Sequence, residues 1–202
     1  MFKNQSNRKK GNTNLIEDHF KENDSFFKTG TIEMTGQKLF QIKLDKLNEI
    51  AKLPGPNEQL RIVTQKAINS FDFILAVLAN EDIEELIVAF YHIGKKVIQE
   101  LHDIQATGKI KTCFFLINDA VPKLTPDAYN LIKSLESENW NVVLENNHTK
   151  IILIKTAQNY YVIEGSGNLS INARIEQYVF DNYQKLFEFH KKWITEIKKE
   201  NG

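Results

Sequence analysis

Two groups of polar residues in the last third of the sequence are of types that can handle a phosphodiester. His148 and Lys150 lie two residues apart in a segment that predicts a β-strand, so their side chains point to the same face. Residues 165–168, with the sequence Gly-Ser-Gly-Asn, follow one predicted hairpin later. The two groups together offer an imidazole, an ammonium, a hydroxyl and an amide to one site.

This combination of side chains suits a phosphate ester. Lys150, Ser166 and Asn168 can neutralise and hold the non-bridging oxygens, while a nearby histidine can attack phosphorus or protonate the leaving group. Gly165 and Gly167 let the backbone approach closely and expose its N–H groups. We therefore interpret the set as a candidate phosphate-handling site.

The two groups meet only if the segment between them folds back on itself. Residues 148–155 and 160–164 each predict a strand, and the segment 156–159, Thr-Ala-Gln-Asn, fits a turn between them. A hairpin of this kind brings its two ends side by side. The sequence thus predicts that the imidazole and ammonium lie close to the hydroxyl and amide.

Strands and helices alternate upstream of the hairpin. Continuous apolar runs predict buried strands at residues 86–91, 110–117 and 140–144. Apolar residues at helical spacing predict helices at residues 66–78, 95–107, from 125 onward and at 181–199, and alternation predicts one more strand at 175–180. This order indicates βαβ units. We expect an α/β fold with a mixed, mostly parallel sheet and helices on both faces.

The segment Pro54-Gly55-Pro56 marks the expected domain boundary. Residues 1–56 are interpreted as an N-terminal extension, basic and partly disordered over residues 1–14, with a helical pattern at 41–53. Residues 57–202 are expected to form the main domain.

Composition is that of an ordinary globular protein. Lys plus Arg and Asp plus Glu both number 26, so net charge gives no sign of a polyanionic partner. The single cysteine, Cys113, lies in an apolar run and is expected to be buried and inert. The N-terminus has no apolar secretory segment, and no stretch approaches the roughly 18 apolar residues of a membrane span. We expect a cytoplasmic protein.

The order His-x-Lys followed by Gly-Ser-x-Asn, flanking a predicted hairpin, resembles the HKD motif of the phospholipase D superfamily. By this resemblance His148 is the nucleophile that forms a phosphohistidine. Lys150 and Asn168 would bind phosphate, and Ser166 would support the site. The family also places an acidic residue, bonded to the histidine, shortly after the asparagine, and Glu176 is the best candidate for it.

The resemblance has consequences for assembly and chemistry. Sites of this family use two histidines, and this chain has one motif, so the resemblance implies a homodimer in which each copy supplies one His148. It implies no metal and no cofactor. The chain resembles the short bacterial single-motif nucleases more than the lipases, so DNA or RNA is the expected substrate.

Two departures from the motif leave alternatives open. Lys155 occupies the position at which the family has an Asp, and the hairpin between Lys150 and Gly165 is a few residues longer than usual. The chain could therefore be a catalytically degenerate module that binds nucleic acid without cutting it, which the basic residues 1–14 favour. Lipid headgroup chemistry is a further alternative, but no membrane-contact segment stands out.

Three further residues are candidates for the site. Arg174 is either a surface residue or a second phosphate contact. Tyr91 ends the expected strand at 86–91 and His92 follows it, at the kind of strand end where ligands bind in parallel α/β sheets. Either residue could line the cleft, and a helix-capping role is the alternative. No histidine has a partner at metal-ligand spacing, so we expect no zinc site.

Overall fold

The computed structural model describes residues 30–34, 37–42, 53–65, 68–170 and 175–200. The strands are β1 (Gly30–Met34), β2 (Gln37–Ile42), β3 (Gln59–Gln65), β4 (Ile83–Phe90), β5 (Ile110–Asn118), β6 (Trp140–Glu145), β7 (Lys150–Lys155), β8 (Tyr160–Gly165) and β9 (Ile175–Asn182). The helices are α2 (Ser70–Leu78), α3 (Lys95–Ala106), α4 (Val121–Leu124), α5 (Pro126–Ser134) and α6 (Gln184–Glu200).

All nine described strands join one sheet in the order β1-β2-β3-β9-β8-β7-β4-β5-β6. The pairs β4–β5, β5–β6 and β2–β3 are parallel. The pairings from β3 through β9, β8 and β7 to β4 are antiparallel, as is β1–β2. A mixed sheet is confirmed, but the expectation of a mostly parallel one was wrong. The cause is that β7, β8 and β9 insert between β3 and β4, and each of them runs antiparallel to its neighbours.

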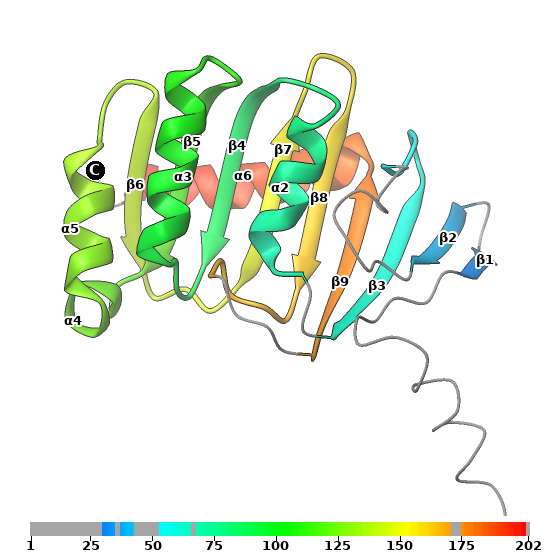
Figure 1. Cartoon of the computed structure of the whole chain (residues 1–202), viewed down its shortest axis with the longest axis horizontal. Helices are drawn as coiled ribbons and strands as arrows, with labels where there is room; N and C mark the ends of the chain where they lie inside the picture. Colours follow the sequence, from blue (N-terminus) through cyan, green and yellow to red (C-terminus); the bar gives the residue numbers. More distant parts are fainter. Residues whose placement is uncertain (1–29, 35–36, 43–52, 66–67, 171–174, 201–202) are drawn as a thin grey trace, which may run out of the picture.

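Helices cover both faces of the sheet, as expected for an α/β fold. Helices α2, α3 and α5 lie on one face, and α6 crosses the strands on the other (Figure 1). Alternating strand side chains feed two apolar clusters. The larger cluster packs Phe73 of α2, Val97 of α3 and Ile132 of α5 against the sheet. The smaller cluster packs Phe187 and Ile194 of α6 against the other face.

The start of α2 is set by its capping residues. The Asn69 side chain accepts a hydrogen bond from the Phe71 N–H at 2.9 Å, and Asp72 accepts one from the Asn69 N–H at 2.8 Å. This capping box starts α2 at Ser70, inside the expected 66–78. The last helix was expected from Asp181, which instead belongs to β9. Asp181 is 5% exposed and accepts a hydrogen bond from Gln59, because β9 must still pair with β3 there.

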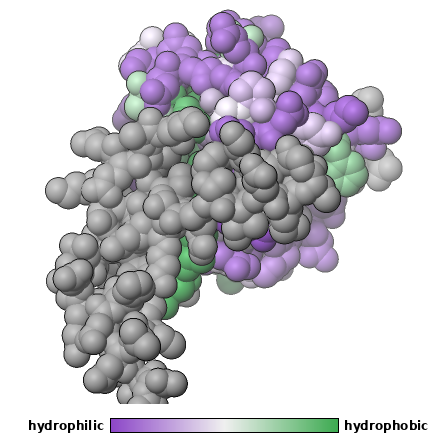
Figure 2. All heavy atoms as spheres, turned by 90° about the vertical axis from the view of Figure 1, so that its right-hand side faces the viewer, coloured by the Kyte–Doolittle hydropathy of each residue, from purple (hydrophilic) through white to green (hydrophobic). Residues whose placement is uncertain are grey.

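The N-terminal extension contributes to the sheet. Its β2 pairs in parallel with β3, and β1 pairs with β2. The basic segment 1–14 and most of the expected helix at 41–53 lie outside the described residues, although Gln41 and Ile42 are in β2. Figure 2 views the molecule from this end of the sheet, where the described surface is mostly hydrophilic. The boundary at residue 56 stays a prediction.

A partly buried carboxylate holds the hairpin in place at the end of the sheet far from Lys150. Glu81, just before β4, accepts hydrogen bonds from the Thr156 hydroxyl at 2.6 Å, the Asn159 amide at 2.9 Å and the Tyr161 hydroxyl at 2.8 Å. These donors sit in and beside the turn between β7 and β8. Burial opposes ionisation of Glu81, but the three hydrogen bonds outweigh it and lower its pKa. The expected turn at 156–159 is thereby confirmed and anchored.

Candidate active site

The site residues gather at one edge of the sheet. The pairings make β3, β4, β5, β6 and β8 run in one direction and β7 and β9 in the other. The carboxyl ends of the first group therefore share an edge with the amino ends of β7 and β9. Helices α2 and α3 follow β3 and β4, so both begin at this edge. Ligands bind at such carboxyl edges in α/β sheets.

The loop that carries His148 is tied to the end of β5. It crosses from β6 past β5 and β4 to reach β7. Asn147 is 5% exposed and donates to the Leu116 carbonyl at 3.1 Å, while its own carbonyl accepts from Asn118 at 3.0 Å. The Asn147 side-chain oxygen accepts from the Thr149 N–H and hydroxyl at 2.9 and 2.7 Å. Both neighbours of His148 are thus fixed by hydrogen bonds.

His148 itself is exposed. It lies in the loop just before β7, which begins at Lys150, so the expected strand from residue 148 is two residues too long. Its imidazole packs on the Tyr91 ring, with centroids 4.8 Å apart and planes at 47°. Lys150 donates to the His148 carbonyl at 3.3 Å. Within the described part of the chain, no carboxylate forms an ion pair with Lys150.

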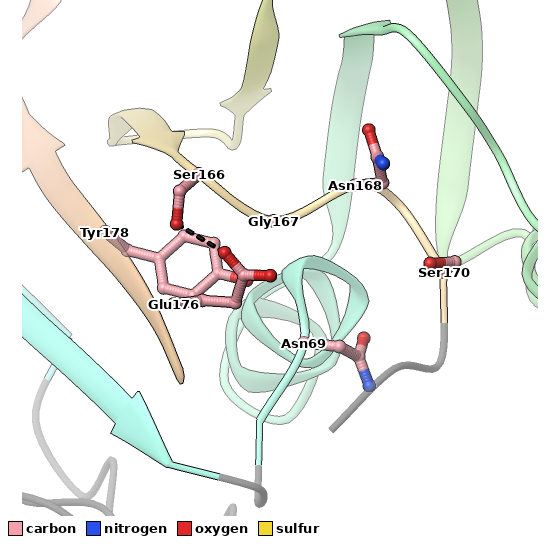
Figure 3. A pocket seen from close by; sticks show the side chains of 7 residues that line it. All are labelled: Asn69, Ser166, Gly167, Asn168, Ser170, Glu176 and Tyr178. Carbon is pink, nitrogen blue, oxygen red and sulfur yellow. Dashed lines mark hydrogen bonds between the residues drawn. The ribbon is translucent and has the colours of Figure 1, made fainter. Parts of the chain in front are cut away.

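Ser166 is held by β9. Its hydroxyl donates to the Glu176 carboxylate, and its oxygen accepts from the Gln177 N–H at 3.0 Å. A serine hydroxyl has one proton, and here that proton points to Glu176 (Figure 3). Glu176 was expected to bond to His148. In the structure its bond is to Ser166, so a role beside the histidine stays a prediction.

Gly165 and Gly167 are required by a neighbouring ring. A Cβ at Gly165 would lie 2.2 Å from Cδ1 of Tyr178, and a Cβ at Gly167 would lie 2.3 Å from the Tyr178 hydroxyl. The phenol also accepts a hydrogen bond from buried Ser70 at 3.3 Å, and Ser70 can donate to the Gly167 carbonyl at 3.1 Å. Burial raises the pKa of Tyr178 to about 12. The turn therefore packs directly on β9 and the start of α2.

Two recesses meet at Ser166. One is a small polar pocket of about 110 Å³, lined by Asn69, Ser166, Gly167, Asn168, Ser170, Glu176 and Tyr178 (Figure 3). The other is an open hollow of about 470 Å³, lined by His148, Thr149, Lys150, Ile151, Glu164, Gly165 and Ser166. Ser166 lines both, so the structure brings His148 and Lys150 together with Ser166 and Gly165.

Asn168 lies on the loop that follows β8 and lines the small pocket. Its side chain points away from Asn69 and Glu176 (Figure 3). Its side-chain oxygen is buried and has no hydrogen-bond partner among the described residues. The loop itself is anchored, because the Gly94 N–H donates to the Leu169 carbonyl at 2.9 Å. Asn168 is thus near the site but lines only the small pocket.

The sequence analysis did not identify Glu164, which also lines the hollow. Its carboxylate lies 3.4 Å from Nε2 of His190 on α6. His190 is 7% exposed, and its Nδ1 accepts a hydrogen bond from the Trp193 indole at 3.1 Å. The contact with His190 outweighs burial and lowers the pKa of Glu164. No motif reveals this group, because the contact joins a strand to a helix 26 positions later.

Lys155 lies at the opposite end of β7 from Lys150. Their Cα atoms are five steps of extended chain apart, or roughly 17 Å. The Lys155 ammonium is 3.1 Å from the Glu84 carboxylate. Lys155 is therefore paired locally and does not line the hollow.

The remaining candidate residues do not line the hollow among the described residues. Tyr91 contacts His148, whereas His92 is only half-buried and its pKa is lowered by desolvation. Arg174 lies outside the described residues. No group of three or more His, Cys, Asp or Glu side chains in the described ranges is arranged to hold a metal ion. None of the described helices is long and apolar enough to cross a membrane.

Comparison with known proteins gives limited information. No protein-family model matches the chain, and no curated protein matches it. Among solved structures, Nuc from Salmonella typhimurium, a phospholipase D family member, is similar with a TM-score of 0.46 and 16% identity over 61% of this chain and 83% of that chain.

TrmBL2, an archaeal chromatin protein with a novel mode of DNA binding, is similar with a TM-score of 0.44 and 13% identity over 69% of this chain and 52% of that chain. Likenesses this distant assign neither a family nor an activity. The functional conclusion therefore depends on the side chains at the sheet edge.

Proposed function

We propose that this chain is a metal-independent phosphodiesterase that cuts nucleic acid. The observation that supports this proposal is the grouping of an exposed imidazole, an ammonium and a hydroxyl around one open hollow, at His148, Lys150 and Ser166. Lys150 has no carboxylate partner among the described residues, so its charge is available to a phosphate. An anchored loop holds the imidazole beside it.

The proposed reaction has two steps and uses His148 as the nucleophile. A ring nitrogen of His148 bonds to phosphorus, the bond from phosphorus to the leaving oxygen breaks, and a second imidazole gives that oxygen a proton. Water then attacks phosphorus, loses a proton to the second imidazole, and the phosphorus–nitrogen bond breaks. Lys150 offsets the negative charge that develops on the phosphoryl oxygens.

The second imidazole is proposed to be His148 of another copy of the chain. Each copy has one His-x-Lys pair, and His148 is exposed at the rim of the sheet, where a second copy can approach. A two-fold axis beside the hollow would place two equivalent histidines on opposite sides of one phosphate. The proposed enzyme is therefore a homodimer.

The direct test measures cleavage of end-labelled single- and double-stranded DNA and RNA in excess EDTA. We expect the unmodified chain to cut, His148→Ala to lose about 10³-fold or more in rate, and Lys150→Ala about 10²-fold. His102→Gln is the matched control, because His102 is a partly exposed histidine on α3. Undiminished cleavage by His148→Ala would exclude the proposed mechanism.

A second candidate function is binding without cutting. The observation that favours it is that Ser166 gives its only proton to Glu176, so neither residue is engaged with His148. A filter-binding assay separates the two functions. A module that only binds would retain intact nucleic acid with a salt-dependent affinity, and Lys150→Ala would weaken the binding while His148→Ala would not.

A further inference from the structure

The imidazole proposed as the nucleophile lies on a loop and is exposed. Among the described residues, neither ring nitrogen of His148 forms a hydrogen bond or an ion pair. An exposed side chain without such partners exchanges between rotamers, whereas attack on phosphorus requires one orientation of the attacking atom. The orientation of the imidazole therefore depends on what packs against the faces of its ring.

The backbone on both sides of His148 is held by neighbouring strand ends. The buried side chain of Asn147 donates to the Leu116 carbonyl at 3.1 Å and accepts from the Thr149 N–H at 2.9 Å. The Thr149 hydroxyl oxygen lies 3.4 Å from the Ala89 carbonyl oxygen on β4. With the backbone fixed in this way, the freedom that remains to the imidazole is rotation about its two side-chain bonds.

Tyr91 contacts the imidazole where that rotation would occur. It immediately follows β4, which pairs with β7, and its ring centroid lies 4.8 Å from that of His148 with the planes at 47°. This geometry is within the range of favourable aromatic pairs. Tyr91 is itself half-buried. The chain that follows it is fixed, because Ile93 is buried and the Gly94 N–H donates to the Leu169 carbonyl at 2.9 Å.

We propose that Tyr91 is a positioning residue for the phosphodiesterase reaction, because its ring restricts the His148 imidazole to one orientation at the rim of the hollow. The inference rests on the proposed function, since it concerns the group that attacks phosphorus. Tyr91 does not line the hollow, so it touches the nucleophile and not the substrate. Its loss should therefore lower kcat and leave KM nearly unchanged.

The kinetic test compares Tyr91→Ala with the conservative variant Tyr91→Phe, on the strand that the unmodified chain cuts fastest in excess EDTA. Tyr91→Ala should lower kcat by about 10- to 100-fold, because small displacements of a reacting group have costs of this size. Tyr91→Phe keeps the ring contact and should keep the activity. An unchanged kcat in Tyr91→Ala, an equal loss in Tyr91→Phe, or a loss carried by KM alone would overturn the inference.

Tyr129→Ala is the matched control. Tyr129 is another half-buried tyrosine, it belongs to α5, and it lines neither of the two recesses. Its kcat should equal that of the unmodified chain at a temperature at which circular dichroism shows every variant to be folded. Equal losses of kcat in Tyr129→Ala and Tyr91→Ala would show a general effect of removing a ring and would also overturn the inference.

The order of the His148 side chain can be measured whether or not the chain cuts. Carbon-13 relaxation of the ring Cε1–H group gives an order parameter for each histidine, and the signal of His148 is the one absent from His148→Gln. The order parameter should fall in Tyr91→Ala and stay unchanged in Tyr91→Phe and Tyr129→Ala.

This measurement keeps the two proposals separable. If no variant cuts but the order parameter of His148 falls in Tyr91→Ala, the phosphodiesterase proposal fails and the restriction of the imidazole by Tyr91 stands. If the order parameter in Tyr91→Ala equals that of the unmodified chain, the inference fails whatever the cutting assay gives.

Discussion

At the scale of single residues, the ring of Tyr178 lies across the turn that carries Ser166. Its ring carbons approach Gly165, and its hydroxyl approaches Gly167. Gly165 therefore leaves room for the ring carbons of Tyr178, and Gly167 leaves room for its hydroxyl. Substitutions at the two glycines can test these two contacts separately.

We expect Gly167→Ala to destabilise the fold by about 1–3 kcal/mol through overpacking, and Tyr178→Phe to relieve much of that cost. The reason is that the atom nearest the added Cβ, at 2.3 Å, is the hydroxyl that phenylalanine lacks. Gly165→Ala is the matched comparison, because its clashes at 2.2 and 2.6 Å are with ring carbons that phenylalanine keeps. Urea unfolding of the single and double variants measures both couplings; equal relief at the two glycines would contradict the packing.

Burial of Asp181 is expected to make the free energy of unfolding depend on pH. It is 5% exposed, and burial raises its pKa from 3.8 to about 6. The folded state thus takes up a proton between these values, so the free energy of unfolding falls as pH rises through that window. We expect Asp181→Asn to be more stable than the unmodified chain by about 1–3 kcal/mol at pH 8, with the gap closing toward pH 4. The Gln59 amide can still donate to the asparagine oxygen.

The measurement is denaturant unfolding of both proteins at several pH values. A constant difference in the free energy of unfolding from pH 4 to pH 8 would show that Asp181 does not titrate in this range. A difference that grows from about pH 4 to about pH 6 and levels off at higher pH is the expected result.

Sequence patterns found the residues whose chemistry is local and missed those whose role depends on packing. His148, Lys150 and Ser166 stood out because their types and spacing are unusual together, and the structure places them around one hollow. Glu164 and His190 are ordinary residues of a strand and a helix, and only the tertiary contact between β8 and α6 pairs them. No periodicity encodes such a contact.

At the scale of secondary-structure elements, Glu81 joins the segment before β4 to the β7–β8 turn. We expect Glu81→Ala to lower the free energy of unfolding by about 2–4 kcal/mol, because three side-chain donors lose a charged acceptor. Its lowered pKa means that this stability is present above pH 4.5 and is lost as the pH falls below it. Glu84→Ala, which removes a solvent-exposed pairing with Lys155, should have a much smaller effect, because exposed ion pairs contribute little to stability.

Thermal unfolding at pH 7 and at pH 4 compares these two variants with the unmodified chain. The loss in Glu81→Ala should be larger at pH 7 than at pH 4. Similar losses for the two glutamates at pH 7 would show that the hydrogen bonds to the turn contribute little.

Most elements of the main domain followed from the sequence. The runs at 86–91, 110–117 and 140–144 form β4, β5 and β6 within a few residues. The strand β3 was not identified, since its seven residues, Gln-Leu-Arg-Ile-Val-Thr-Gln, carry a weak alternation. Strand direction was also missed, because an apolar run buries equally well in a parallel or an antiparallel pair, and only the partners decide between them.

At the scale of the whole molecule, the proposed dimer makes a quantitative prediction for mixtures. If each site needs His148 from both copies, activity should fall with the square of the fraction of unmodified chain. Co-refolding equal amounts of the unmodified chain and His148→Ala should therefore leave about a quarter of the activity. If each copy carries a complete site, about half remains. The assay is the EDTA-resistant cleavage rate across a series of mixing ratios.

The position of α6 has a consequence for how tightly the hollow is organised. This helix covers the smaller apolar cluster and carries His190, and its Lys191 forms an ion pair with Glu85 at 2.7 Å. Detachment of α6 would expose the cluster and release the Glu164 carboxylate in a single event. Amide hydrogen exchange in α6 therefore reports on the contact between Glu164 and His190: Glu164→Ala, which removes that contact, should speed exchange along the helix.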